Sequence, residues 1–211
     1  MTRWNEIPPD EIERRSFEII GSTLGDTKFD PDVEAVVKRV IHTTADFDYV
    51  ENLYFSETAI ESGLRALRLG VNLVTDTHMA EAGINKTELK RLGGQIHCFM
   101  SDTEVAAVAS SRNVTRASVS MEKACGLTNP LIIAVGNAPT ALMRLSELIE
   151  DKLISPDLVI AVPVGFVNVV ESKEMIKKAN VQCIVAEGRK GGSNVAAAIC
   201  NALLYRLTRD Q

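Results

Sequence analysis

The clearest acid–base candidate in this chain of 211 residues is His42, in the run Ile41-His42-Thr43-Thr44-Ala45-Asp46. An unperturbed imidazole titrates near pH 6.5, so a histidine donates or accepts a proton near neutrality. The threonines and the aspartate that follow are suited to orient its ring. The residues alone leave two interpretations open: a proton-transfer residue, or a histidine stabilised by the C-terminal end of a helix.

The other two histidines predict little by themselves. His78 adjoins an expected helix start, and His97 lies inside an expected buried strand, where a hydrogen-bonded core histidine is the simpler interpretation. No histidine has the spacing to cysteines or paired carboxylates that is typical of a metal site. The sequence also contains neither a Gly-x-Ser-x-Gly elbow nor a phosphate-binding loop with Gly-Lys-Ser. We therefore predict no metal centre.

Two glycine-containing loops have the composition of anion sites. The loop from Gly188 to Asn194 carries Arg189 and Lys190, and its Gly191-Gly192-Ser193 run precedes an expected helix whose free amides favour an anion. The turn Gly136-Asn137-Ala138-Pro139 also opens onto a helix start. Plain turn and capping chemistry explains each loop equally well when it is taken alone. Further candidate anion contacts, each more often a solvated surface residue, are Arg15-Ser16, Arg112 and Arg116.

The elements expected to position these residues change type along the chain. Residues 1–69 look mainly helical, with helices from Pro8-Pro9 to Gly21, from Asp30-Pro31 to His42, and from about residue 57 to 69. From residue 70 on, near-continuous apolar runs alternate with helical stretches, as in a parallel sheet covered on both faces. The runs are residues 71–75, 95–99, 131–135, 158–162 and 182–186.

This pattern predicts an α/β protein of one domain, residues 1–211, with a three-layer, doubly wound, mainly parallel sheet of about five strands and flavodoxin-like order. Such sheets bind ligands beyond the carboxyl ends of their strands. The segments that follow the five runs include Thr77, Gly136, Gly165 and the loop from Gly188. We expect all of them to line one edge of the sheet.

Composition limits the possible functions. The formal net charge of −5 argues against a nucleic-acid binder, although a local pocket can still be basic. No apolar run reaches the roughly 20 residues of a membrane-spanning helix, and the first residues do not resemble a signal peptide. Four cysteines without a Cys-x-x-Cys pair are typical of a reducing compartment, so we expect a cytoplasmic protein.

Taken together, five motifs resemble the precorrin-8X methylmutase family, in the same order and over essentially the whole chain. They are Arg15-Ser16-Phe17, Ile41-His42-Thr43-Thr44-Ala45-Asp46, Val135-Gly136-Asn137-Ala138-Pro139-Thr140-Ala141-Leu142, Pro163-Val164-Gly165-Phe166-Val167 and Gly188-Arg189-Lys190-Gly191-Gly192-Ser193. The resemblance implies a cytoplasmic homodimer with a flavodoxin-like core that acts late in cobalamin synthesis and needs no organic cofactor.

The implied reaction moves a methyl group from carbon 11 to carbon 12 of ring C in precorrin-8 or cobalt-precorrin-8, giving hydrogenobyrinate or cobyrinate. By the resemblance, His42 protonates a ring C nitrogen. The acetate and propionate arms of this corrinoid fit the anion-ready loops. The residues expected to bind the substrate are Arg15, Ser16, Thr43, Thr77, Arg116, Gly136, Asn137, Gly165, Lys190, Gly191 and Ser193.

Two alternatives remain at this point. A non-catalytic corrinoid-binding or carrier protein would present the same pocket without the proton transfer. A generic flavodoxin-like enzyme for a phosphorylated or nucleotide ligand would bind flavin or nucleotide, and no fingerprint in the sequence favours it.

Overall fold

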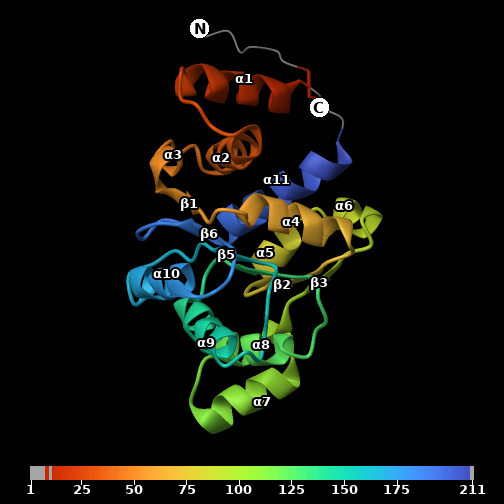
Figure 1. Cartoon of the computed structure of the whole chain (residues 1–211), viewed down its shortest axis with the longest axis vertical. Helices are drawn as coiled ribbons and strands as arrows, with labels where there is room; N and C mark the ends of the chain where they lie inside the picture. Colours follow the sequence, from red (N-terminus) through yellow and green to blue (C-terminus); the bar gives the residue numbers. More distant parts are fainter. Residues whose placement is uncertain (1–7, 10, 210–211) are drawn as a thin grey trace, which may run out of the picture.

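In the computed structural model, which describes residues 8–9 and 11–209, a six-stranded sheet is covered by helices on both faces (Figure 1). The order across the sheet is β1-β6-β5-β4-β2-β3, and all neighbours except β1 and β6 are parallel. The strands are β1 (Leu53–Phe55), β2 (Asn72–Thr75), β3 (Gln95–His97), β4 (Leu131–Val135), β5 (Leu158–Ala161) and β6 (Cys183–Ala186).

All five apolar runs expected from the sequence contain a strand, and β1 is an addition to them. It pairs antiparallel with β6, with Leu53 opposite Ala186, and it lies within the part of the chain expected to be mainly helical. Counted along the chain, the five parallel strands stand in the order 2-1-3-4-5. The winding therefore reverses between β2 and β4, where open α/β sheets place their ligands.

The continuous apolar strands supply two separate cores, because successive side chains point to opposite faces of the sheet. In β4, Ile132 belongs to the core under α4 and α11, whereas Ile133 belongs to the core under α8 and α9. One face carries α4 (Ala59–Arg68), α5 (His78–Gly83), α6 (Lys86–Arg91) and α11 (Ser193–Thr208). The other carries α8 (Arg116–Ala124), α9 (Pro139–Glu150) and α10 (Val169–Lys178).

Two further helices extend the molecule beyond the three expected layers. α2 (Pro31–Thr44) packs on α11, α1 (Ile12–Leu24) packs on α2, and the short α3 (Tyr49–Asn52) leads into β1. Figure 1 shows α1 at one end of the long axis. α1 begins at Ile12 rather than at the prolines. Before it, the amide of Glu11 donates to the carbonyl of Pro8 and so forms a separate turn. α2 continues past His42 until Ala45 adopts a left-handed conformation.

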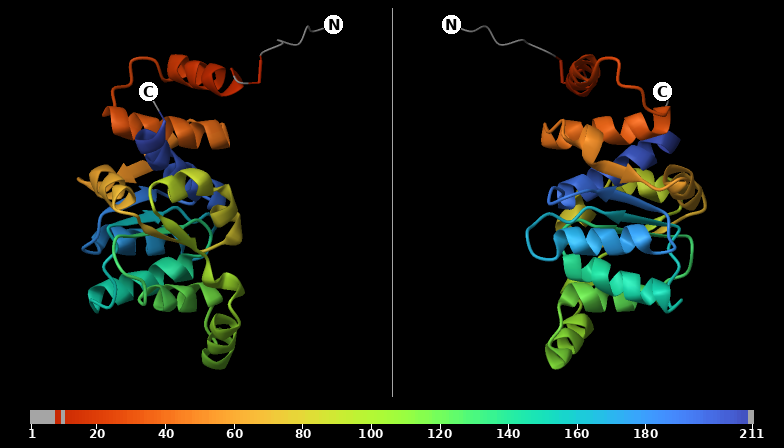
Figure 2. Two further views of the ribbon diagram at one scale, coloured as in Figure 1. Left: turned by 90° about the vertical axis from the view of Figure 1, so that its right-hand side faces the viewer. Right: turned by 60° about the vertical axis from the view of Figure 1, so that its left-hand side comes forward.

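α7 (Thr103–Arg112) is the outermost helix at the opposite end, and Figure 2 shows it projecting from the body of the molecule. A short 3₁₀ turn (Phe99–Ser101) links it to β3. It packs on α8 through a small cluster of buried side chains, Val105, Ala109 and Val119. Among the described residues, no helix combines the length and the apolar character needed to cross a bilayer.

Candidate active site

Loops that follow separate strands bond to one another at the carboxyl edge of the sheet. The hydroxyls of Thr77, just after β2, and Ser193, at the start of α11, lie 2.8 Å apart. The amide of Gly165, after β5, donates to the carbonyl of Arg189, after β6, at 3.2 Å. The loops after β2, β5 and β6 therefore form one continuous surface, as the strand pattern predicts.

A buried carboxylate organises the turn after β4. Asp76 directly follows β2 and is 1% exposed, and its oxygens accept hydrogen bonds of 2.7–2.8 Å from the amides of Gly136, Asn137 and Ala138. Burial raises the pKa of the Asp76 carboxyl group, and the amide hydrogen bonds oppose that effect. The expectation that this turn offers free amides to a ligand therefore needs correction, because Asp76 already occupies them.

Two glycines allow the loop backbones to approach closely. A Cβ atom on Gly136 would lie 2.7 Å from the Cα of Ser193, so the turn after β4 packs directly against the start of α11. A Cβ atom on Gly191 would lie 2.1 Å from the carbonyl oxygen of Val162. That carbonyl accepts a hydrogen bond of 2.8 Å from the amide of Gly192. Gly136 and Gly191 are therefore at this edge for close backbone packing.

A buried lysine holds the loop that runs from Gly188 to Asn194. Lys173 on α10 is 1% exposed, and its Nζ donates to the carbonyls of Gly188 at 2.8 Å and Lys190 at 2.9 Å. Burial lowers the pKa of Lys173 to about 8. Asp76 and Lys173 position the site, and neither is among the residues that the sequence singles out. Lys173 stands among other charged residues, Glu171, Glu174 and Lys177, and so resembles a surface position in the sequence. Asp76 has one usable signal, its place directly after an apolar run.

Lys190 ties the end of α2 to this edge. Its Nζ lies 2.6 Å from a carboxylate oxygen of Asp46 and 2.6 Å from one of Asp48, both in the segment after α2. Hydrogen bonds to these carboxylates raise the pKa of Lys190, and the bond from Lys190 lowers the pKa of Asp46. Lys190, expected to hold a substrate carboxylate, therefore already has two internal partners. The contact brings the segment that follows His42 to the loop after β6.

His42 lies in the last turn of α2 and is exposed. Its ring stacks on Phe17 of α1, with 5.2 Å between ring centroids and 27° between planes. Thr44 and Asp46 do not orient it as expected, because the Thr44 hydroxyl donates to the Val40 carbonyl at 2.8 Å and Asp46 pairs with Lys190. Phe17 therefore sets the orientation of the imidazole within the part of the chain that the structure describes.

Charged residues surround this stacked pair. The guanidinium of Arg39 lies 4.6 Å from the centroid of the Phe17 ring and forms an ion pair with Glu13. The hydrogen bond from Arg39 lowers the pKa of Glu13, with smaller contributions from the positive charges of Arg209 and His42. Phe17 and Arg39 also line an open cleft of about 650 Å³ between α1, α2 and α11.

The remaining candidates on α1 and α2 are Arg15, Ser16 and Thr43. Arg15 pairs with Glu18 at 2.9 Å, and the hydroxyl of Ser16 donates to the carbonyl of Ile12 at 2.8 Å. Both directly precede Phe17, whose ring stacks on His42, yet their side chains bond within α1. Thr43 is exposed next to His42.

Arg116 approaches the same edge from the other face of the sheet. It begins α8, whose N-cap Thr115 lies 2.7 Å from Thr140 at the start of α9, hydroxyl to hydroxyl. Arg116 and Asn137 are exposed, and within residues 8–9 and 11–209 neither side chain forms an ion pair or hydrogen bond. These two polar groups are therefore available to a ligand, in contrast to Lys190.

Apolar side chains are also exposed near this edge. After β5, the loop presents Val164, Phe166 and Val167, of which Phe166 is 85% exposed. Met79, two residues beyond Thr77, is 72% exposed. Exposed apolar groups gathered among polar ones indicate a binding surface. The arrangement suits a ligand with a broad apolar body and peripheral anionic groups, and it adds an exposed histidine for proton transfer.

The chain is similar to known proteins over nearly its whole length. The sequence profile described as precorrin-8X methylmutase matches residues 11–206. Over 206 residues the chain is 45% identical to the cobalt-precorrin-8 methylmutase of Salmonella typhimurium, covering 94% of this chain and 96% of that protein. Over 197 residues it is 43% identical to the Priestia megaterium protein of the same name, covering 93% and 88%. The solved precorrin-8x methylmutase from Thermus thermophilus aligns with a TM-score of 0.85 at 39% identity, covering 92% of this chain and 96% of that one.

Proposed function

Since the chain belongs to the precorrin-8X methylmutase family, we propose that it moves the methyl group of precorrin-8 or cobalt-precorrin-8 from carbon 11 to carbon 12 of ring C, with His42 as the general acid. The protein is an isomerase of cobalamin biosynthesis, a methylmutase. An intramolecular methyl shift needs a proton donor, a cavity that fits the substrate and charged groups in fixed positions, and it needs no nucleophile.

The observation that carries the proposal is the placement of His42. It is exposed at the end of α2, stacked on Phe17, and the following segment is bonded to the loop after β6 through Lys190. In the proposed step, the imidazolium of His42 donates its proton to a nitrogen of ring C. The proton changes the electronics of the conjugated macrocycle and favours the methyl migration. The imidazole regains a proton when the ring nitrogen loses it.

The other residues at the sheet edge are proposed to hold the substrate. Arg116 and the side chain of Asn137 have no internal partner in the described chain and would bind peripheral carboxylates. The hydroxyl pair of Thr77 and Ser193 offers a further polar contact. The exposed Phe166 would cover an apolar face of the macrocycle. Lys190 would bind a substrate carboxylate only if it gave up its ion pairs with Asp46 and Asp48.

We also propose that the natural substrate contains cobalt. Both curated relatives described above carry the name cobalt-precorrin-8 methylmutase. The cobalt is cargo held by the macrocycle, so the protein need not supply a ligand to it. Parallel turnover of metal-free and cobalt-containing precorrin-8 tests this choice, and a clear preference for the metal-free ring would reverse it.

The proposal includes a single domain with a flavodoxin-like core, a homodimer and a cytoplasmic location. The strand order 2-1-3-4-5 supports the fold assignment. The exposed Val164, Phe166 and Val167 supply apolar area that a second copy would cover beside the substrate. Free cysteines suit the reducing cytoplasm. Light scattering of the purified protein tests the dimer, and a monomeric mass at micromolar concentration would remove it from the proposal.

The decisive test is single-turnover absorption spectroscopy of wild-type protein and His42→Phe. A positioned general acid contributes about 10²–10⁴-fold to a rate, so His42→Phe should bind the ring and rearrange it at least about 100-fold more slowly. His97→Gln is the matched control, because His97 lies in β3 and bonds Asn72 at 2.9 Å, away from His42. Wild-type-like turnover by His42→Phe would refute the acid. Binding by wild type without any spectral rearrangement would instead show a corrinoid carrier.

A further inference from the structure

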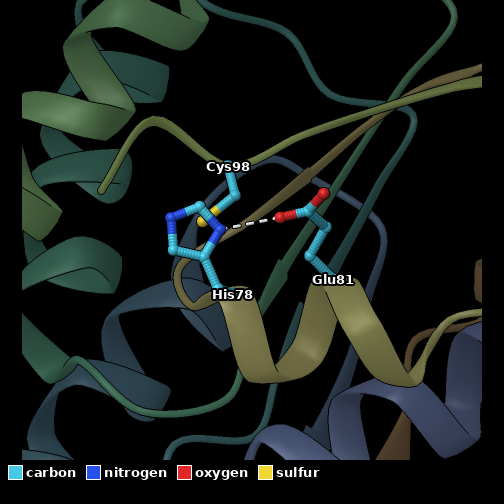
Figure 3. Close-up of side chains that lie close together, drawn as sticks. All are labelled: His78, Glu81 and Cys98. Carbon is cyan, nitrogen blue, oxygen red and sulfur yellow. Dashed lines mark hydrogen bonds and ion pairs between the residues drawn. The ribbon is translucent and has the colours of Figure 1, made fainter. Parts of the chain in front are cut away.

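Three potential metal ligands converge near the edge of the sheet, and none of them is among the residues assigned to the corrinoid, although His78 directly follows Thr77. His78 and Glu81 lie one turn apart on α5, and Cys98 follows β3 (Figure 3). One ligand atom from each, a ring nitrogen, a carboxylate oxygen and the sulfur, all lie within 4.8 Å of one another. Because Cys98 comes from a different element, this is more than an i,i+3 surface pair.

The imidazole of His78 is held at both nitrogens. Nδ1 lies 2.8 Å from the Oε2 of Glu81, and Nε2 lies 2.7 Å from the hydroxyl of Ser101. A histidine that ligates a metal through one nitrogen generally has its other nitrogen fixed by a hydrogen-bonding group. Ser101 supplies that second contact and leaves Nδ1 directed at Glu81. The side chain of His78 is 52% exposed, so a cation can reach the cluster from solvent.

We propose that His78 Nδ1, a carboxylate oxygen of Glu81 and the sulfur of Cys98 form a binding site for a borderline-soft divalent cation such as Zn²⁺. A nitrogen, oxygen and sulfur set suits Zn²⁺, and three protein ligands leave one tetrahedral position for water. The ligands contract from their mutual spacing onto metal bonds of about 2.0–2.3 Å. The bound cation cross-links α5 to the segment after β3. This inference does not depend on the proposed methylmutase mechanism.

Binding requires the thiol to lose its proton. Burial raises the pKa of the Cys98 thiol, hydrogen bonds with the Met100 backbone and the Thr75 side chain oppose that effect, and the negative charges of Glu81 and Asp76 add to it. The hydrogen bond from His78 lowers the pKa of Glu81, with a further contribution from Lys86, so this carboxylate is ionised and ready to ligate. The cation replaces the proton on sulfur, which passes to solvent. His78 Nδ1 donates to Glu81 in the metal-free protein, so on binding the neutral ring adopts the tautomer with its hydrogen on Nε2, which then donates to Ser101. Affinity should therefore increase with pH.

Co²⁺ and Zn²⁺ titrations of the full chain, freed of metal with a chelator, test the site. We expect one Co²⁺ per chain with a thiolate-to-cobalt absorption band in the near ultraviolet, and displacement of that band by Zn²⁺. Cys98→Ser should abolish the band, whereas Cys125→Ser, a change at another half-buried cysteine, should keep it. Ser101→Ala should weaken the affinity by about 10–100-fold, as expected for a group that orients a ligand.

Glu81→Gln provides a second test that leaves both soft ligands in place, and it should weaken Zn²⁺ binding while retaining a weaker cobalt–thiolate band. Circular dichroism checks that each variant is folded. Absence of stoichiometric binding by folded wild-type protein would overturn the proposal. So would Co²⁺ binding without a thiolate band, or equal Zn²⁺ affinity in wild type and in either Cys98→Ser or Glu81→Gln. None of these outcomes alters the test of His42, which is read from substrate spectra.

Discussion

Replacing Gly191 by alanine should loosen the loop after β6, because its backbone and its surroundings both exclude a side chain. Gly191 has φ +153°, and an added Cβ would lie 2.1 Å from the carbonyl oxygen of Val162. Backbone strain of this kind costs about 1–3 kcal/mol. Forcing an extra carbon into packed surroundings costs about 1–3 kcal/mol more. The expected loss in unfolding free energy is therefore about 2–6 kcal/mol.

Gly188→Ala is the matched control within the same loop. Gly188 has φ +69°, but no atom lies within 4 Å of its added Cβ. This variant should lose about 1–2 kcal/mol from the left-handed backbone alone. Thermal unfolding followed by circular dichroism checks both, since 1 kcal/mol shifts Tm by about 2–4 °C in a chain of this size. The expected decreases are about 4–24 °C for Gly191→Ala and about 2–8 °C for Gly188→Ala. Equal decreases in the two variants would refute the argument from close packing.

Three other predictions concern charged groups around the site. Burial lowers the pKa of Lys173 to about 8 in the folded protein, so between pH 8 and about 10.5 the unfolded chain binds more protons than the folded one. The free energy of unfolding should therefore rise with pH over this range, by up to about 3 kcal/mol relative to Lys173→Met. Urea unfolding at several pH values measures this difference, and identical pH slopes would contradict it. Asp76→Asn places an NH₂ group against backbone amides that donate to a carboxylate in the wild type. Urea unfolding should show a decrease of about 2–4 kcal/mol in the free energy of unfolding. The decrease is smaller than the lost hydrogen bonds alone would give, because the variant no longer buries a charge. Unchanged stability would remove Asp76 as the organiser of the turn after β4. Lys190→Ala removes exposed ion pairs, so Tm should change little while single-turnover rearrangement slows; an unchanged rate would show that this contact does not position His42.

The sheet was predictable because its central strands are covered on both faces. In β4 every residue from Leu131 to Val135 is buried, which produces an uninterrupted apolar run. β1 was missed because its three residues are too few to show a period and it pairs antiparallel at an edge. The added layers of α1 and α2 follow from packing between distant segments, which the period of a helix does not reveal.

The candidate site was only partly predictable, for a similar reason. The strand-edge rule placed Thr77 and the loop that leads to Ser193 at one edge of the sheet, and the contact between their hydroxyls agrees with that placement. The partner of Lys190 was not accessible from local sequence, because Asp46 lies 144 positions away. His78, Glu81 and Cys98 are likewise joined by the meeting of α5 with the end of β3, and their spacing matches no common metal motif.

The attachment of α7 has a consequence for how the molecule opens. Its cluster contains Val105 and Val119, and a fully buried valine contributes about 1.5–3 kcal/mol. α7 should therefore undergo local unfolding at a free energy well below that of β4, and its amides should exchange with deuterium sooner. The segment from Cys98 to Ser101 leads directly into α7. A cation at Cys98 would anchor that segment, and protection from exchange would then extend outward along the base of the projecting helix.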